Sequence, residues 1–199
     1  MSRITAAGPP SKRPPHNELD VSLRILASAV LLAALALAPL AVTGKPAASQ
    51  AGRPLAAKLD RSRAGTLAPP VKFTTRDGDA ATVANFRGKP VLVNLWATWC
   101  APCIAELPDL DELAENRRAS LTVLTISQDL GGWRAIDKFW TTGKFERIVP
   151  RLDAQGNYAQ AVGAAGLPVS ILYDAKGREV WRINGPVKWT SAEAAAALR

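Results

Sequence analysis

The chain has 199 residues, 48% of them hydrophobic and 21% charged, which allows one globular domain of ordinary size plus appendages and excludes a disordered chain. Its net charge of +8 is concentrated in residues 1–66, where nine Lys and Arg face three Asp and Glu (net +6); residues 67–199 carry sixteen against fourteen (net +2). The basic charge therefore does not form a folded binding face, and with no nucleic-acid motif present we expect no nucleic-acid partner.

The N-terminal third of the chain contains a long apolar segment. Ile25–Val42 carries no charge over 18 residues, and a helix of that length spans about 27 Å, close to the hydrocarbon core of a bilayer. We therefore expect a tail over residues 1–22 and a single transmembrane anchor over residues 23–43. The alternative is the apolar core of a cleaved signal peptide.

A flexible linker is expected over residues 44–66, which are rich in Ala, Pro, Lys and Arg and contain no aromatic residue. The folded domain is expected over residues 67–199. It begins with a strand at Val71–Thr75, a turn, and a second short strand near Thr82–Val83, which together predict an N-terminal β-hairpin.

Strands and helices then alternate along the chain. The run Val91–Ala97 is almost continuously apolar, as expected of a parallel strand covered on both faces. A helix follows over residues 103–116, in which Pro108 predicts a kink. Further strands are expected at Leu121–Ser127, Ile148–Leu152, Val169–Tyr173 and Glu179–Ile183, and further helices at Trp133–Thr142, Asn157–Val162 and from Thr190, with Glu193 completing a capping box. This order predicts a central mixed sheet with helices on both faces.

The two cysteines of the chain, Cys100 and Cys103, lie three residues apart between that apolar strand and the helix. This arrangement is typical of thiol–disulfide exchange. Cys100 is expected at the helix N-terminus, where free N–H groups and the helix dipole favour a thiolate. Cys103, about one turn later, is then placed to resolve a mixed disulfide. Pro102 is compatible with a first helical turn.

A metal site and a purely structural disulfide are the alternatives for this pair. Zinc and iron–sulfur sites commonly need four ligands, but the chain has no third cysteine and its one histidine is His16. A disulfide that closes so short a loop removes little entropy from the unfolded chain. Redox exchange is therefore the favoured interpretation, with no metal and no cofactor.

The segment Val91–Pro108 (VLVNLWATWCAPCIAELP) strongly resembles the TlpA/ResA branch of membrane-anchored thioredoxin-like thiol:disulfide oxidoreductases. The resemblance extends from about Ala68 to Arg199, with supporting marks at Asn85–Pro90 and Gly166–Pro168. Gly185–Trp189 is more similar to TlpA than to ResA. The resemblance implies an α/β, thioredoxin-like fold: a central mixed β-sheet flanked by helices, with an N-terminal β-hairpin extension and a single N-terminal transmembrane helix.

The resemblance also implies roles for particular residues. Cys100 would be the nucleophile and Cys103 the resolving thiol, and Pro168 matches the cis-proline beside the dithiol. Glu106 matches an acidic residue that could relay a proton to the thiolate of Cys103; the alternative is a solvated helix carboxylate.

Four residues are expected to contact the substrate protein: Trp99, Ala101, Pro102 and Leu167. Leu167 would pair through its backbone with an extended substrate segment. Trp99 is expected to shape and shield the site, and Trp96 to lie in the core.

By resemblance, the protein is expected to be a monomeric reductase in the bacterial inner membrane, with a cytoplasmic tail and its thioredoxin-like domain in the periplasm. Its clients would be cysteine pairs of cytochrome oxidase copper-site assembly factors or of apocytochrome c, and a DsbD/CcdA-type membrane protein would supply electrons. The alternatives are an oxidase that introduces disulfides and a copper-binding assembly chaperone. The chaperone is disfavoured because residues 67–199 contain no histidine.

Overall fold

The structure of the protein, a computed structural model, describes residues 54–143 and 145–199. The expected tail, the expected transmembrane anchor and the start of the expected linker lie outside these residues. Among the helices of the described part, none is long and apolar enough to cross a membrane. The described residues thus comprise the expected domain together with the end of the expected linker.

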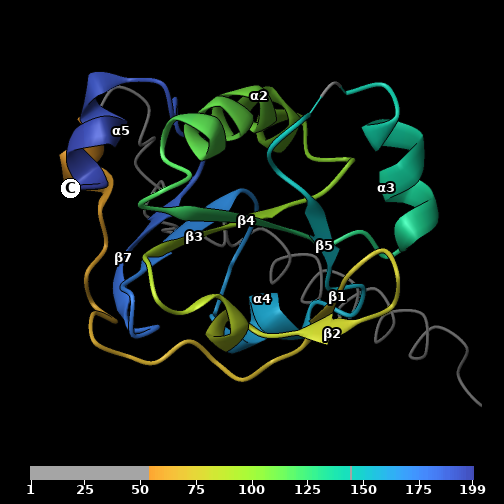
Figure 1. Cartoon of the computed structure of the whole chain (residues 1–199), viewed down its shortest axis with the longest axis horizontal. Helices are drawn as coiled ribbons and strands as arrows, with labels where there is room; N and C mark the ends of the chain where they lie inside the picture. Colours follow the sequence, from red (N-terminus) through yellow and green to blue (C-terminus); the bar gives the residue numbers. More distant parts are fainter. Residues whose placement is uncertain (1–53, 144) are drawn as a thin grey trace, which may run out of the picture. The chain divides into compact units, whose positions relative to one another are not determined.

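A seven-stranded mixed sheet forms the centre of the domain, in the order β2–β1–β5–β4–β3–β6–β7 (Figure 1). The strands are β1 (Phe73–Thr74), β2 (Ala80–Ala81), β3 (Val91–Trp96), β4 (Thr122–Ser127), β5 (Pro150–Leu152), β6 (Val169–Tyr173) and β7 (Glu179–Asn184). β3, β4 and β5 run parallel, whereas β6 and β7 are antiparallel to their neighbours. Every residue of β3 is buried, as its continuous apolar run predicts. The predicted mixed sheet is therefore confirmed.

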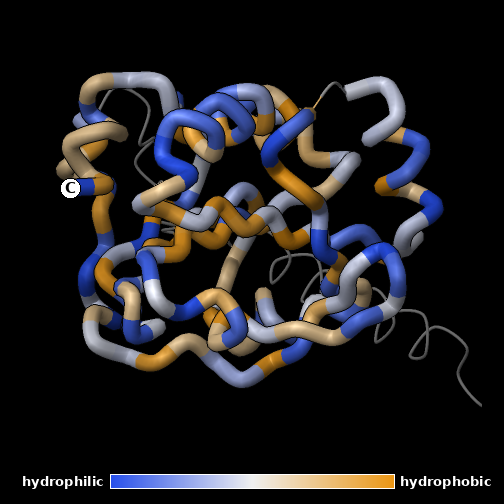
Figure 2. Tube along the Cα trace, viewed as in Figure 1, coloured by the Kyte–Doolittle hydropathy of each residue, from blue (hydrophilic) through white to orange (hydrophobic). Residues whose placement is uncertain are grey.

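Helices cover both faces of this sheet. On one face lie α2 (Ala101–Asn116), α3 (Trp133–Trp140) and α5 (Ala192–Ala197), and on the other lie α4 (Asn157–Ala161) and the 3₁₀ helix η2 (Val83–Phe86) (Figure 1). One apolar cluster fills each side, and Figure 2 shows hydrophobic residues concentrated in the central strands. Both cysteines belong to the cluster beneath α2. The redox pair is therefore part of the core.

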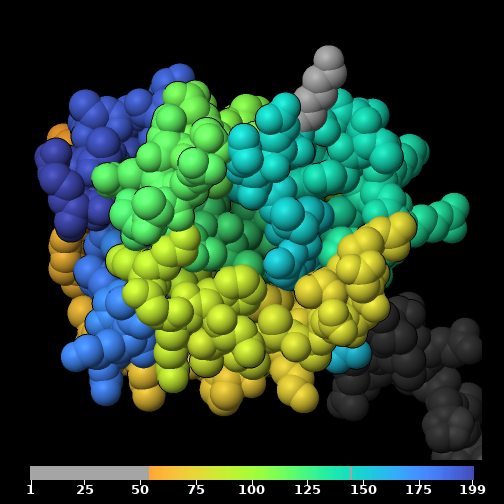
Figure 3. All heavy atoms as spheres, viewed as in Figure 1, coloured from red at the N-terminus to blue at the C-terminus, as the bar shows by residue number. Residues whose placement is uncertain are grey.

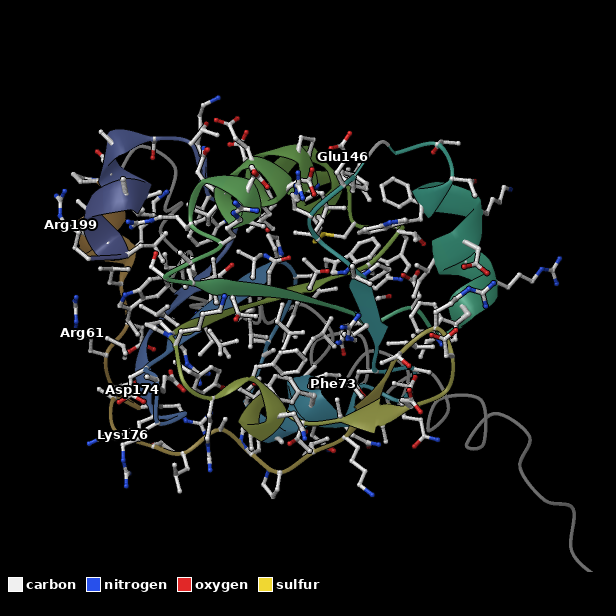
Figure 4. All side chains as sticks on the ribbon, viewed as in Figure 1. Arg61, Phe73, Glu146, Asp174, Lys176 and Arg199 are labelled. Atoms are coloured by element: carbon white, nitrogen blue, oxygen red, sulfur yellow. A yellow bond between two sulfur atoms is a disulfide. The ribbon has the colours of Figure 1, made fainter. Side chains whose placement is uncertain are left out.

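The expected N-terminal hairpin is present as β1 and β2. Phe73 of β1, labelled in Figure 4, packs edge-on against the ring of Tyr158 in α4, with ring centroids 6.2 Å apart. At the turn, Arg76 forms an ion pair with Asp137 of α3 at 2.9 Å. The hairpin, yellow in Figure 3, accordingly lies against the teal surface of α3. These contacts join the hairpin to both helical layers.

The second strand and the last helix differ in detail from the sequence prediction. The second strand ends before Thr82, because the N–H of Thr82 donates to Asn85 Oδ1 at 2.8 Å and the chain enters η2 instead. Helix α5 is capped by Ser191, whose Oγ accepts the N–H of Ala194 at 3.1 Å. Glu193 therefore does not complete a capping box.

The end of the expected flexible linker is ordered: residues 54–66 pack along β7 and α5. The 3₁₀ helix η1 (Leu55–Lys58) begins with the N–H of Leu55 donating to Glu193 Oε2 at 3.0 Å. Asp60 and Arg182 exchange two backbone hydrogen bonds of 2.9 Å, which cover the open edge of β7. Leu55 is also buried in the apolar cluster beneath α2, so backbone bonds and one buried leucine order a segment that contains no aromatic residue.

β7 also holds a buried ion pair between Arg182 and Glu179. Their two hydrogen bonds measure 2.6 and 2.7 Å, and the side chains are only 7% and 4% exposed. Such a pair is costly to desolvate, but losing one partner leaves a buried charge without compensation.

We predict that Glu179→Gln lowers the free energy of unfolding by about 3–5 kcal/mol, because the guanidinium of Arg182 stays buried and loses its counter-charge. Asp137→Asn, which breaks the exposed pair with Arg76, is the matched control and should cost less than about 1 kcal/mol. Urea unfolding of both variants measures the difference, and equal losses would contradict the prediction.

Candidate active site

The cysteine pair lies at the start of α2, directly after β3. Cys100 is the N-cap residue of the helix, and its Sγ accepts the N–H of Cys103 at 3.3 Å. The two residues form a disulfide, drawn yellow between α2 and the sheet in Figure 4. Cys100 is 6% exposed and Cys103 is fully buried. An incoming thiolate therefore meets Cys100 first, and the helix N-terminus stabilises the thiolate that Cys100 becomes.

Helix α2 starts two residues earlier than predicted and continues through Pro108 to Asn116. Pro102 lies in the first turn, where backbone N–H groups have no helical acceptor, so it removes no helical hydrogen bond. Ala101 and Pro102 are both exposed beside the buried sulfur atoms.

Glu106 lies inside the domain and not on its surface, so the solvated-carboxylate alternative is wrong. Its side chain is 4% exposed. Oε1 accepts a hydrogen bond from Asn94 Nδ2 at 2.6 Å, and Oε2 accepts the N–H of Val187 at 3.0 Å. Residues three apart on a helix are neighbours on one face, so Glu106 lies close to Cys103.

Burial raises the pKa of Glu106 from its ordinary value of 4.5 to about 7. The hydrogen bonds from Val187 and Asn94 lower the pKa and oppose this shift, but do not cancel it. The buried indole N–H of Trp189 also lowers the pKa, although it makes no hydrogen bond within the described residues. Desolvation is therefore the larger effect, and the carboxyl group can exchange a proton near neutral pH.

Asn94, Val187 and Trp189 are site residues that the sequence analysis did not find. Asn94 is a polar residue in an otherwise apolar buried strand, and its Nδ2 also donates to Ser170 Oγ at 3.1 Å. A polar residue within an apolar strand is a signal in the sequence that could have pointed to Asn94. Val187 contacts Glu106 from a loop 81 positions later, and Trp189 lies in the same loop. Gly185–Trp189 carried part of the resemblance, but no local pattern connects it with Glu106.

The expected substrate-contact residues come together at one end of the sheet. Val169 pairs with Leu95, so Leu167 and Pro168 lie beside the end of β3 that leads to Cys100. The Leu167–Pro168 peptide bond is cis, as expected. Leu167 is half-buried, and Trp99 is 69% exposed.

An open groove of about 260 Å³ runs beside the site, between α2 and the loop before α5. It is lined by Pro102, Ala105, Glu106, Asp109, Pro186, Val187 and Lys188. The groove gives solvent a route to the carboxyl group of Glu106. A larger groove of about 370 Å³ between η1 and α5 includes no residue of the cysteine site.

Comparisons with known proteins agree with this geometry. Residues 63–198 match the Redoxin family. The chain is 28% identical over 130 residues to thiol-disulfide oxidoreductase ResA of Bacillus thuringiensis, covering 64% of this chain and 73% of the relative. It is 32% identical over 122 residues to thiol:disulfide interchange protein DsbE of Pseudomonas fluorescens, covering 61% and 66%. Among solved structures, StoA of Bacillus subtilis superposes with a TM-score of 0.54 at 22% identity, covering 66% of this chain and 98% of its own.

We predict that the stability of the protein falls between about pH 4.5 and pH 7, and that Glu106→Gln removes this slope. The folded-state pKa of Glu106 is raised, so its contribution is fully present below pH 4.5 and is lost as the pH rises through about 7. The loss amounts to about 3 kcal/mol. Urea midpoints at pH 4.5 and pH 8 measure it. An unchanged pH slope in Glu106→Gln would contradict the assignment, whatever pH-independent cost the substitution has.

Proposed function

The chain belongs to the Redoxin family and is a thiol:disulfide oxidoreductase; we propose that it works as a membrane-anchored reductase of cysteine pairs in client proteins. The observation that carries this proposal is the Cys100–Cys103 pair at the helix N-terminus with a buried carboxyl group, Glu106, beside it. The direction, the clients and the anchor are the parts of the proposal that go beyond the family.

The electrostatics around the pair support the reducing direction. A disulfide is strongly oxidising when the reduced form is stabilised, which happens when the thiolate has strong favourable partners. Here the first turn, Ala101–Ile104, contains no Lys or Arg, and one backbone N–H faces the Cys100 sulfur. Glu106 adds a group that becomes negative near neutral pH. The Cys100 thiolate is thus stabilised by the helix N-terminus alone, and a negative Glu106 opposes a thiolate at Cys103. The reduced form gains little extra stability, which favours giving up electrons.

The proposed reaction moves two electrons from the dithiol to a client disulfide. The Cys100 thiolate attacks one client sulfur, and the other client sulfur leaves as a thiolate that takes up a proton. Cys103 then loses its proton to Glu106 and attacks the Cys100 sulfur. This step releases the second client thiolate and forms the Cys100–Cys103 disulfide found in the structure. When a donor reduces the protein again, Glu106 returns the proton to Cys103.

Client contact is assigned to the residues around the exposed side of Cys100. Trp99 offers a large apolar surface, and Ala101 and Pro102 are exposed at the first turn of α2. Leu167, which precedes Pro168 at the open end of β6, is placed to bind an extended client segment through its backbone.

We also propose a cellular setting, based on the apolar segment and on the resemblance to the TlpA/ResA branch. Residues 23–43 would anchor the chain in a bacterial inner membrane, with residues 1–22 in the cytoplasm and the domain in the periplasm. The clients would be cytochrome oxidase copper-site assembly factors or apocytochrome c, and a DsbD/CcdA-type protein would be the electron donor. The likeness to proteins named ResA and DsbE supports this setting.

We predict a reduction potential near that of thioredoxin, about −270 mV. The full-length chain in detergent, equilibrated with dithiothreitol buffers and followed by thiol trapping, gives the value. A potential near that of DsbA, about −120 mV, would reverse the proposed direction and favour a disulfide-introducing oxidase.

We predict that Glu106→Gln flattens the pH dependence of thiol–disulfide exchange between about pH 6 and pH 8, because the group with a pKa of about 7 is removed. The rate of client-disulfide reduction is measured across this range for both proteins. Glu112→Gln, which removes an exposed carboxylate further along α2, is the control and should keep the wild-type profile. A wild-type profile in Glu106→Gln would exclude the proton relay.

A further inference from the structure

A second buried carboxylate, Asp129, contacts the loop that leads to the cysteines. It follows β4 and is 1% exposed. Its Oδ1 accepts the hydroxyl of Thr98 at 2.6 Å, and its Oδ2 accepts the N–H of Thr98 at 3.0 Å and the hydroxyl of Ser127 at 2.6 Å. Thr98 stands two residues before Cys100. The carboxylate therefore joins the β4–α3 loop to the β3–α2 loop.

These contacts extend the pairing of two parallel strands beyond their ends. β3 and β4 pair as far as Trp96 and Ser127, and the N–H of Gln128 still donates to the Trp96 carbonyl at 2.8 Å. After that the chains separate, and in the described residues the hydrogen bonds that continue between the two loops are those of Asp129 with Thr98. Because hydrogen bonds to a buried carboxylate are strong, this junction is stiff.

The junction fixes one side of the turn that presents Cys100. The turn closes through the N–H of Cys100, which donates to the Ala97 carbonyl at 3.1 Å. Thr98 lies inside the same turn, so its position decides where Cys100 meets the first N–H groups of α2. The 3.3 Å bond from the Cys103 N–H to the Cys100 sulfur depends on that position.

Asp129 does not serve its own helix in the way that another buried aspartate does. Asp153 is 4% exposed and accepts the N–H groups of Asn157, Tyr158 and Ala159, which is a local cap at the start of α4. The carboxylate oxygens of Asp129 instead accept hydrogen bonds from Thr98 and Ser127. Its strongest contacts outside its own loop are thus to the active-site turn.

We propose that Asp129 is a positioning residue for thiol–disulfide exchange: through Thr98 it holds the turn that places the Cys100 sulfur at the N-terminus of α2. The inference rests on Cys100 being the attacking thiolate of the proposed function, but not on the direction of electron flow or on the clients.

The test is the rate of iodoacetamide alkylation of the reduced full-length chain in detergent, measured from pH 5 to pH 9. Asp129→Asn should slow alkylation at pH 7 by about tenfold and move the half-maximal rate to higher pH, because the helix N-terminus no longer meets the sulfur well. Thr98→Val, which keeps the carboxylate and removes one bond, should slow it by about threefold. Thr98→Ser, which keeps the hydroxyl, should restore the wild-type rate.

Asp153→Asn is the matched control, since it weakens a buried carboxylate cap without touching the active-site turn. It should lower the urea midpoint and leave the alkylation profile unchanged. Thr98→Val keeps the proposal testable if Asp129→Asn does not fold.

Two outcomes would overturn the proposal. If Asp129 acts only through its charge, its removal favours the thiolate, and Asp129→Asn would alkylate faster at low pH. If it is only structural, Asp129→Asn and Thr98→Val would lose stability and keep the wild-type profile, as Asp153→Asn does. Mass spectrometry of the alkylated wild type shows which cysteine reacts first. Alkylation at Cys103 would refute Cys100 as the nucleophile of the proposed function, whatever the variants do.

Discussion

The junction between β3 and α2 is the constraint on which the site depends. β3 is buried on both faces, so its end has a fixed place in the core, and α2 begins four residues later with Cys100 as its N-cap. The helix N-terminus thereby supplies the N–H that faces the Cys100 sulfur, while Cys103 turns inward and is fully buried. One sulfur is thus open to attack and the other is reserved for resolution, which is the asymmetry that exchange requires.

The burial of Glu106 has a cost in stability that the proposed proton relay would explain. A carboxyl group in an apolar core is unfavourable when ionised, and its donors, Asn94 and Val187, reduce that cost without removing it. A core selected for stability alone would place an apolar residue there. The pKa of about 7 is the result that a proton relay to Cys103 needs near neutral pH.

The sequence predicts those parts of the fold that depend on local pattern. The apolar run of β3, the helix after the cysteines and the strand after Pro168 lie where periodicity and turn residues place them. Glu106 is buried in part by a loop 81 positions away, and residues 54–66 are ordered by backbone bonds to β7 and by the burial of Leu55. The sequence near Glu106 and near residues 54–66 does not reveal these distant contacts. An exposed carboxylate at Glu106 therefore stayed an alternative, and residues 44–66 were predicted to be flexible along their whole length.

Three separate segments lie around the turn that carries Cys100, and substitutions in each leave the two cysteines in place. Asp129 reaches it from the end of β4, Leu167 and Pro168 lie beside it at the start of β6, and Val187 approaches through Glu106. The carboxyl ends of β3 and β4 form this edge of the sheet, which is where open α/β sheets commonly place their sites. Under these proposals, the position of the Cys100 sulfur, proton transfer and client contact depend on different neighbours of one turn, so a substitution in one segment should change one property and leave the others largely intact.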